Sequence, residues 1–326
     1  MVGTRFLLRL GAIASLVATP LAATYTIEDT YDTTSFFDGF DFYSSADPTN
    51  GFVKYHTASA ANSSSLAGYA NGGIYLGTDH KTLNPNSGRG STRINSKKTY
   101  TQGLFIADIT HMPTSSKQGC GLWPAFWMFG EDGGWPNSGE IDVIEGVNSA
   151  DSTTMTLHTS SGCTMSQGNC NAGNGGTGCS QAVNDTESFG AGFNEIGGGV
   201  YAVEWTSSAI SIWFFPRSSI PSNIGTGKPN PSSWGTATAK FSGSGCNIDN
   251  HFKEHTIVFN IDFCGDWAGK VWSEDETCST LADTCQDYVS ANPGDFQEAY
   301  WLINSVKVYS SNSSSKRDVV ARPFLA

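Results

Sequence analysis

The chain has 326 residues, a formal net charge of −12, a charged fraction of only 15% and an aromatic fraction of 12%. This length suits one large all-β domain or two smaller ones. A surface this acidic repels nucleic acid and anionic membranes, so neither is expected as a partner, whereas a neutral polymer suits it as a substrate.

The first 23 residues have the pattern of a secretory signal peptide. Two arginines, Arg5 and Arg9, precede an apolar run, Leu10–Val17, and the small residues Ala22 and Ala23 suit signal peptidase. The run is shorter than the ~20 apolar residues that a membrane span needs. We therefore expect a secreted protein, extracellular or associated with the cell wall, whose mature chain begins near Thr24.

The chain that follows is predicted to be mostly β-strand. Runs rich in Val, Ile, Thr and aromatic residues alternate with clusters of Gly, Asn, Ser and Pro, as strands do with turns. Many short strands of this kind favour an all-β sandwich of two antiparallel sheets. Long helices are hard to find in the pattern, and the moderate helix candidates are short, such as Cys278–Val289. The predicted strands are Phe52–Thr57, Gly73–Leu76, Gly103–Ile109, Ala125–Phe129, Glu140–Glu145, Thr154–Thr159, Gly199–Trp205, Ile210–Phe215, His255–Phe263 and Trp301–Tyr309.

Eight cysteines lie in the predicted mature chain. An even number in a secreted protein indicates disulfides. A zinc cluster is the less favoured alternative, because the sequence contains no Cys-x-x-Cys. Eight cysteines allow 105 pairings, so the connectivity stays open. The cysteines are Cys120, Cys163, Cys170, Cys179, Cys246, Cys264, Cys278 and Cys285.

Three Asn-x-Ser/Thr sequons could carry glycans after export, at Asn62, Asn184 and Asn312. The chain is predicted to form one domain over residues 24–309, followed by a polar, disordered tail over 310–326. Within this tail, Lys316-Arg317 is either a dibasic processing site or an exposed charged pair.

Three acids fall within six residues of one predicted strand: Glu140, Asp142 and Glu145. Strand alternation places Glu140 and Asp142 on one face and Glu145 on the other. One extra residue near Val143–Ile144, a β-bulge, would return Glu145 to the face of Glu140, and bulges often lie beside active sites. The sequence therefore predicts a bulge in this strand.

Acids clustered on a buried face raise one another's pKa, which a structural protein does not need. Glycoside hydrolysis does need a raised carboxyl pKa, because one carboxylate must be ionised while its neighbour holds a proton. Two long Glu side chains that lean together from one strand approach the ~5–5.5 Å separation of retaining enzymes, so retention is favoured over inversion. The alternative is an exposed acidic strand or a cation site.

Three tryptophans precede the acids closely: Trp123, Trp127 and Trp135. Aromatic rings stack on the apolar faces of sugar rings. Trp135 lies between Gly134 and Pro136 in a predicted loop, which favours a place in the cleft. Trp127 lies in an apolar run and suits the core equally well.

Several motifs resemble glycoside hydrolase family 16, and more narrowly the fungal endo-1,3(4)-β-glucanases, also called laminarinases or mixed-linkage glucanases. The resemblance runs through most of the mature chain. Its motifs are Gly121–Trp127 (GLWPAFW), Gly134–Asn148 (GWPNSGEIDVIEGVN), Leu157–Cys163 (LHTSSGC) and Val258–Gly269 (VFNIDFCGDWAG).

This resemblance implies a concanavalin A-like β-jelly-roll with a substrate cleft across its concave face. It implies that Glu140 is the nucleophile, that Glu145 is the acid/base, and that Asp142 assists by a hydrogen bond to the nucleophile. The implied substrate is a β-glucan, no cofactor is required, and the protein is expected to be a monomer. Whether a structural calcium binds stays open.

Three further residues are candidates for substrate binding. The resemblance places His158 near the acids, although a lone histidine is more often structural. Arg93 could donate hydrogen bonds to sugar hydroxyls, or it could be an ordinary surface arginine. Trp267, beside Asp266 in a Gly-rich turn, could be a further stacking platform.

Two alternative functions remain at this stage. A cell-wall transglycosylase would use the same carboxylate pair, although fungal members usually show the shorter Glu-x-Asp-x-Glu spacing. A catalytically silent glucan-binding sandwich shares the architecture, but it would be expected to lack one of the acids.

Overall fold

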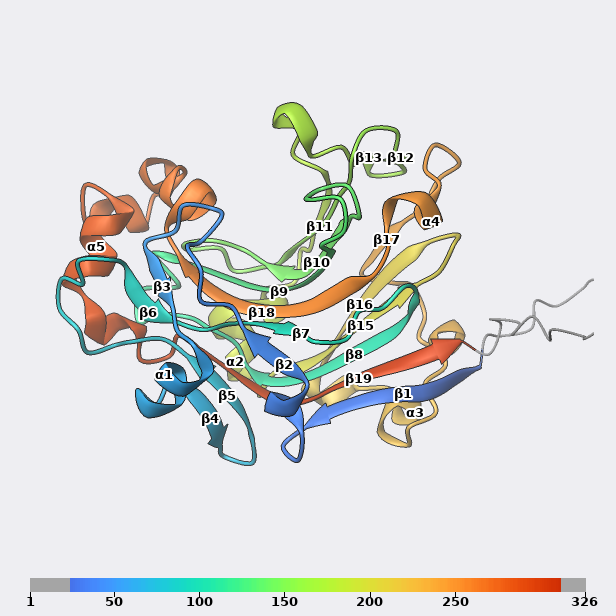
Figure 1. Ribbon diagram of the computed structural model, residues 1–326, viewed down its shortest axis with the longest axis horizontal. Helices are drawn as coiled ribbons and strands as arrows, with labels where there is room; N and C mark the ends of the chain where they lie inside the picture. Colours follow the sequence, from blue (N-terminus) through green and yellow to red (C-terminus); the bar gives the residue numbers. More distant parts are fainter. Residues whose placement is uncertain (1–23, 312–326) are drawn as a thin grey trace, which may run out of the picture.

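The computed structural model describes residues 24–311, and the predicted signal peptide, Asn312 and Lys316-Arg317 lie outside this range. Two curved antiparallel sheets pack face to face (Figure 1), which confirms the predicted sandwich. Within residues 24–311, no helix has the length and apolar character needed to cross a membrane.

The eight-stranded sheet forms the convex layer, and β8, β15 and β19 lie at its centre. Its strands, in spatial order, are β17 (Ala239–Phe241), β16 (Ile210–Pro216), β15 (Gly199–Trp205), β8 (Gly103–His111), β19 (Tyr300–Ser311), β5 (Gly73–Gly77) and β4 (Ala67–Ala70), with β1 (Tyr25–Asp32) also paired to β19. Ser310 and Ser311 thus lie in a strand, where the tail was predicted to begin.

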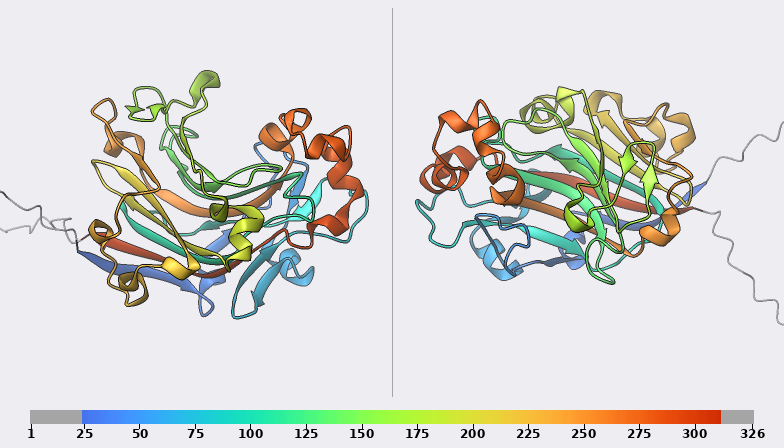
Figure 2. Two further views of the ribbon diagram at one scale, coloured as in Figure 1. Left: turned by 180° about the vertical axis from the view of Figure 1, so that it is seen from behind. Right: turned by 90° about the horizontal axis from the view of Figure 1, so that it is seen from above.

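The seven-stranded sheet forms the concave layer. Loops rise on both sides of its outer face (Figures 1 and 2). Its strands, in spatial order, are β14 (Cys179–Ala182), β11 (Thr154–His158), β10 (Glu140–Glu145), β9 (Leu122–Gly130), β18 (His255–Phe263), β7 (Arg93–Ser96) and β2 (Phe40–Phe42).

The remaining elements are short and lie outside the two main sheets. Two small pairs are β12 (Thr164–Met165) with β13 (Gly168–Asn169), and β3 (Val53–Tyr55) in parallel with β6 (Arg89–Ser91). The α-helices are α1 (Ala58–Ser63), α2 (Gly190–Glu195), α3 (Ser222–Gly225), α4 (Ile248–His251) and α5 (Cys285–Ala291). Single helical turns of 3-10 or π type span Phe36–Asp38, Gly173–Gly175, Thr186–Ser188, Arg217–Ser219, Pro231–Ser233, Gly265–Gly269, Trp272–Glu274, Cys278–Thr280 and Pro293–Phe296.

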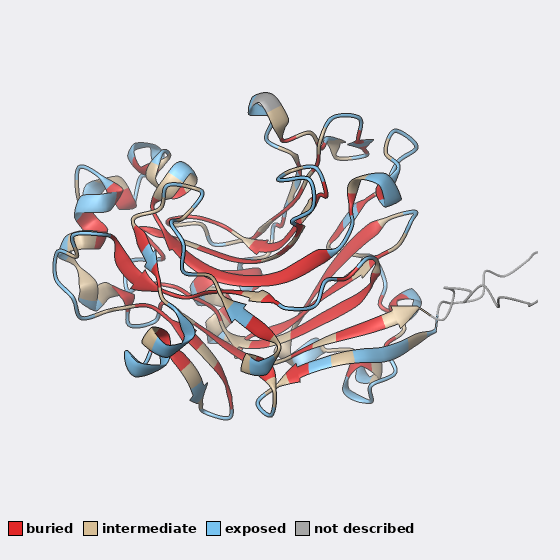
Figure 3. Ribbon diagram, in the orientation of Figure 1, coloured by how far each residue is buried: buried red, intermediate tan, exposed pale blue. Residues whose placement is uncertain are grey.

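The core lies between the sheets, where the central strands are buried along most of their length (Figure 3). Alternation along β15 explains this: Tyr201, Val203 and Trp205 point into the main core. Val200 and Ala202 point outward, into a second apolar cluster that the segment around Trp234 covers. Both faces of this central strand are therefore covered by apolar side chains.

Every predicted strand coincides with a strand of the structure, whereas the predicted helix Cys278–Val289 is wrong as a single element. A 3-10 turn over Cys278–Thr280 ends before α5 begins at Cys285. The helix α5 begins at Cys285 because the Thr284 hydroxyl accepts a hydrogen bond from the Asp287 N–H at 3.1 Å and so caps the helix N-terminus.

Candidate active site

A cleft crosses the concave face of the seven-stranded sheet. It has a volume of about 380 Å³, and β7, β9, β10 and β18 contribute to it. Aromatic rings and polar groups share its lining, as in sites that bind ligands with both apolar faces and hydroxyl groups. The lining residues are Asp47, Pro48, Thr49, Arg93, Trp123, Ala125, Trp127, Trp135, Glu140, Asp142, Glu145, Asn260, Asp262 and Asp266.

Strand β10 carries the three acids and contains the predicted bulge. Its register with β9 shifts between Asp142 and Ile144. Val143 and Ile144 are both fully buried in the core, so two consecutive side chains point away from the cleft. Glu145 consequently faces the cleft together with Glu140 and Asp142.

Each glutamate accepts a hydrogen bond from a tryptophan indole. Trp135 Nε1 donates to Glu140 Oε2 at 3.0 Å, from the loop before β10. Trp123 Nε1 donates to Glu145 Oε1 at 2.9 Å, from β9. Trp135 is 53% exposed, so its ring is open to the cleft while its nitrogen holds the carboxylate. These indoles fix the position of the acids and present aromatic rings beside them.

His158 lies directly opposite Glu140, on β11. Its Nε2 is 3.2 Å from Asp142 Oδ2 and 3.7 Å from Glu140 Oε1. The strand pairing that aligns β10 with β11 thus brings this histidine to the acids, as the resemblance implied.

Burial dominates the electrostatics of the cluster. It raises the pKa of Asp142 well above its usual value, and it raises the pKa of Glu145 to about 8, with a further contribution from the Asp142 charge. Burial and the Asp142 charge also raise the pKa of Glu140, against the opposing influence of His158 and the Trp135 hydrogen bond. With a pKa of about 8, Glu145 therefore retains its proton at neutral pH, as acid catalysis requires.

Trp127 and Arg93 meet beside the acids. Trp127 is half-buried, and its Nε1 donates to Asn260 Oδ1 at 2.8 Å, so the ring lines the cleft. The Arg93 guanidinium carbon lies 5.0 Å from the Trp127 ring centroid and 4.5 Å from that of Tyr43. Arg93 is 6% exposed, which excludes the alternative of an ordinary surface arginine.

Trp267 does not line this cleft. Its ring packs edge-on against Trp123, with centroids 5.8 Å apart, while its neighbour Asp266 reaches the lining. Through this contact, Trp267 supports the ring of Trp123.

The sequence did not reveal the acidic and amide groups at one end of the cleft. Asp262 and Asn260 come from β18, and both are buried. Thr49 Oγ1 donates to Asp262 Oδ2 at 3.0 Å, which ties the segment from Asp47 to the cleft floor. The only available signal was alternation along β18, which places both polar residues on one face.

Four disulfides cross-link the domain: Cys120–Cys278, Cys163–Cys246, Cys170–Cys179 and Cys264–Cys285. All eight cysteines are used, which confirms the prediction of disulfides and supplies their connectivity.

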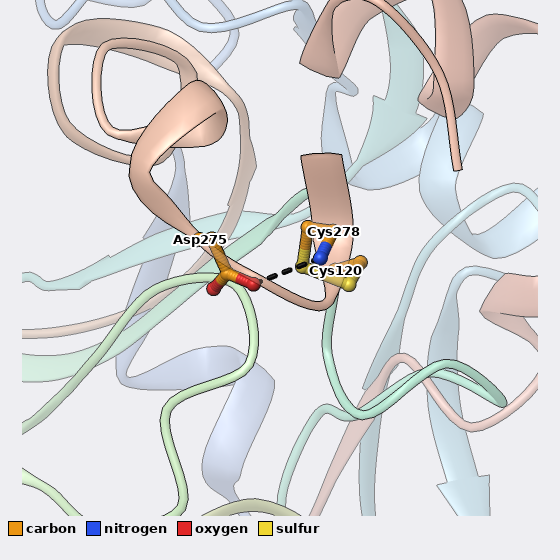
Figure 4. Close-up of side chains that lie close together, drawn as sticks. All are labelled: Cys120, Asp275 and Cys278. Carbon is orange, nitrogen blue, oxygen red and sulfur yellow. Dashed lines mark hydrogen bonds between the residues drawn. A yellow bond between two sulfur atoms is a disulfide. The ribbon is translucent and has the colours of Figure 1, made fainter. Parts of the chain in front are cut away.

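Two groups among residues 24–311 bring three potential metal-binding atoms within 4.8 Å of one another. One comprises Glu140, Asp142 and His158. The other, Cys120, Asp275 and Cys278 (Figure 4), has another explanation, because its two cysteines form a disulfide. Asp275 Oδ1 accepts the Cys278 N–H at 2.8 Å, and Oδ2 accepts the Ser149 hydroxyl at 2.7 Å. Partial burial raises the pKa of Asp275, but these hydrogen bonds outweigh burial and hold that pKa below its usual range.

The sequons at Asn62 and Asn184 both lie at exposed positions. Asn62 lies in the last turn of α1, and Asn184 follows β14.

Comparison with known proteins gives the family. The family model for the XgeA-like catalytic GH16 domain matches residues 40–309. An endo-1,3(4)-β-glucanase of Arthroderma benhamiae is 43% identical and covers 95% of this chain, which spans 69% of that protein. The chain spans only about half of several other curated relatives, such as 50% of a probable endo-1,3(4)-β-glucanase of Aspergillus fumigatus that is 45% identical.

Solved structures agree with this comparison. GH16 Laminarinase 16A of Phanerochaete chrysosporium is 40% identical, with a TM-score of 0.82 over 88% of this chain and 100% of that one. An elongating GH family 16 β-1,3-glucosyltransferase matches with the same identity, coverage and TM-score. The family model and a curated relative above 40% identity, each matching most of the chain, show that it belongs to glycoside hydrolase family 16, beside the fungal endo-1,3(4)-β-glucanases.

Proposed function

We propose that this protein is a secreted, retaining endo-β-glucanase that hydrolyses 1,3-linked or mixed 1,3/1,4-linked β-glucans. The observation that carries the proposal is the bulged strand β10, which directs Glu140, Asp142 and Glu145 into one cleft. The names of the fungal relatives support the substrate class. The four disulfides support export, because disulfides persist in oxidising compartments.

In the proposed first step, a Glu140 carboxylate oxygen attacks the anomeric carbon. The bond from that carbon to the leaving oxygen breaks, and Glu145 transfers its proton to this oxygen. In the second step, Glu145 takes a proton from water, the water oxygen bonds to the anomeric carbon, and Glu140 is released. The Trp135 N–H on Glu140 supports its ionised form. A pKa of about 8 keeps Glu145 protonated at neutral pH.

Asp142 assists between the two glutamates. It is 3% exposed, and burial raises its pKa well above its usual value, which favours its protonated form and so lessens the negative charge beside the nucleophile. His158, near both Asp142 and Glu140, offers a hydrogen-bond partner as charge develops.

The proposed substrate lies along the cleft, over the rings of Trp123, Trp127 and Trp135. These rings stack on sugar faces, while Arg93 and Asn260 contact hydroxyl groups at the floor. Aromatic stacking together with hydrogen bonds to hydroxyl groups suits a neutral glucan.

Replacing Trp123 with Phe is expected to move the alkaline limb of the pH–rate profile to higher pH. The indole hydrogen bond favours the ionised form of Glu145 and so opposes burial, which raises its pKa to about 8 with this bond in place. Without this bond, Glu145 keeps its proton to higher pH, although kcat/KM falls overall because a stacking surface is lost. The measurement is kcat/KM on laminarin between pH 4 and pH 10. A limb that stays in place, or moves to lower pH, would contradict the acid/base role of Glu145.

Transglycosylation by the same covalent intermediate is the second candidate. It is favoured by the 40% identity to the solved elongating glucosyltransferase. Mass spectra of products from laminarin, lichenan and a short oligosaccharide acceptor are expected to show mainly shorter chains. Products that are mostly longer than the added oligosaccharide would show that transfer, not hydrolysis, is the main reaction.

A further inference from the structure

A second sugar-compatible surface lies away from the cleft, at an edge of the sandwich. Here β2 ends the seven-stranded sheet and β4 ends the eight-stranded sheet, with α1 beside them (Figure 1). A groove of about 340 Å³ opens among these elements. Its lining residues are Phe37, Phe40, Asp41, Phe42, Ala58, Asn62, Ala67 and Lys97.

The floor of this groove is apolar and aromatic. Phe40 and Ala67 belong to the main core and are only 2% and 7% exposed, so the groove reaches the edge of the core itself. The Phe37 and Phe42 rings stack with centroids 5.9 Å apart, and Phe37 also packs against Tyr69 at 5.2 Å. Tyr69 is 53% exposed, so the aromatic surface continues outward from the groove.

The rim is polar but balanced in charge. Lys97 Nζ lies 3.8 Å from Asp41 Oδ1 and donates to the Asp38 carbonyl at 2.9 Å. One cation and one carboxylate beside an aromatic floor suit a neutral ligand that has hydroxyl or amide groups and an apolar face, which describes a sugar ring.

Asn62 supplies a covalent connection to such a ligand. It is the acceptor of the sequon Asn62-Ser63-Ser64, and its exposed side chain lines the groove. Because Asn62 is exposed, its side chain is accessible to a modifying enzyme.

We propose that an N-linked glycan on Asn62 is a structural part of this domain, with its first N-acetylhexosamine residue lying in the aromatic groove. In the modification, Asn62 Nδ2 bonds to C1 of a lipid-linked diphospho-oligosaccharide. The bond from C1 to the diphosphate breaks, and the amide proton leaves with the diphosphate. The seated sugar covers the apolar edge where the sheets end. The inference needs entry into a glycosylating secretory pathway, but it is independent of the catalytic proposal.

The test uses the full chain secreted from a glycosylating eukaryotic host. Asn62→Gln and Ser64→Ala remove the sequon in two ways, Ser64→Thr preserves it, and Asn184→Gln removes the other described sequon as a matched control. Peptide mass spectra report occupancy of each site. We expect occupancy at Asn62 and a Tm at least about 2 °C lower in Asn62→Gln and Ser64→Ala, a shift typical of a lost interaction in a domain of this size. Ser64→Thr and Asn184→Gln should stay close to wild type, and activity on laminarin should be unchanged in all four.

A second comparison tests whether the first sugar residue lies in the aromatic groove. An endoglycosidase that leaves only the first N-acetylglucosamine should preserve most of the Tm gain. In a Phe37→Leu background, which keeps apolar volume but removes the flat ring, Ser64→Ala should lower Tm by less than half as much as in wild type.

Three results would overturn the inference. An unoccupied Asn62 would remove its basis, and an equal loss of Tm from Asn62→Gln and Asn184→Gln would show a general effect of glycans. Electron density for a free laminari-oligosaccharide in this groove, in crystals of the Asn62→Gln protein, would instead make it a site for soluble glucan.

Discussion

Glu140→Gln and Glu145→Gln are each expected to lower kcat/KM on laminarin by about 10²–10⁴-fold or more, the range that loss of a positioned proton-transfer group gives. Glutamine is nearly the same size as glutamate, but it neither attacks an anomeric carbon nor transfers a proton. The two variants should differ on an aryl glucoside whose leaving group needs no proton. The first step should then recover in Glu145→Gln, because only its acid is missing, whereas Glu140→Gln should stay inactive because it lacks the nucleophile. The same response from both variants would contradict the assigned roles.

The control for these variants is thermal stability as a function of pH. Burial raises the pKa of Glu140 in the folded protein above its unfolded value of about 4.3. The folded state therefore binds this proton more tightly than the unfolded state does. Proton binding by Glu140 stabilises the fold fully below about pH 4.3, and this stabilisation is lost as pH rises through the folded pKa. Glutamine carries no charge at any pH. The Tm of Glu140→Gln relative to wild type should consequently rise from pH 4 to pH 8, which a misfolded variant would not show.

Removing the disulfide Cys120–Cys278 is expected to cause the largest loss of stability among the four. It joins residues 158 apart in sequence, whereas Cys170–Cys179 joins residues 9 apart. In the chain-entropy model, the stabilisation is about 5 kcal/mol for the long loop and roughly 2.5 kcal/mol for the short one. The two Cys→Ala double variants should therefore differ in Tm by roughly 5–10 °C, measured by calorimetry, at 2–4 °C for each kcal/mol.

The long disulfide also has a functional consequence. Cys120 lies just before β9, which carries Trp123 and the indole contact to Glu145. Loss of the bond should thus lower kcat more than loss of Cys170–Cys179. Equal Tm values for the two double variants would show that loop length does not govern their contributions.

Local patterns were enough to predict much of this fold. The strand β10 was predicted at its observed bounds, and the spacing of Glu140 and Glu145 required the bulge that the structure shows. The bulge is predictable because the sequence separation of the two glutamates is odd, which strict alternation would place on opposite strand faces. This argument needs no knowledge of distant strands. The neighbouring aromatic residues were predictable for the same reason, since Trp123 and Trp135 are close to the acids in sequence.

Contacts between distant segments were not predictable. Asp262 is 213 residues from Thr49, and their hydrogen bond depends on the arrangement of strands in the sheet. The strand β7 was missed because its polar residues include Arg93, which is buried only through rings supplied by other elements. The prediction of one helix over Cys278–Val289 was wrong because it rested on an apolar pattern, which does not show that Thr284 caps a helix inside this range.

Trapping of the glycosyl-enzyme tests the central claim most directly. A 2-deoxy-2-fluoro laminari-oligosaccharide with an activated leaving group slows the second step, so a covalent adduct accumulates on the nucleophile of a retaining enzyme. Tandem mass spectrometry of the peptide that contains both glutamates then locates the sugar. The proposed mechanism predicts one added fluoro-oligosaccharyl group on Glu140 and none on Glu145. A label on Glu145, or turnover that releases the inverted anomer without any adduct, would contradict it.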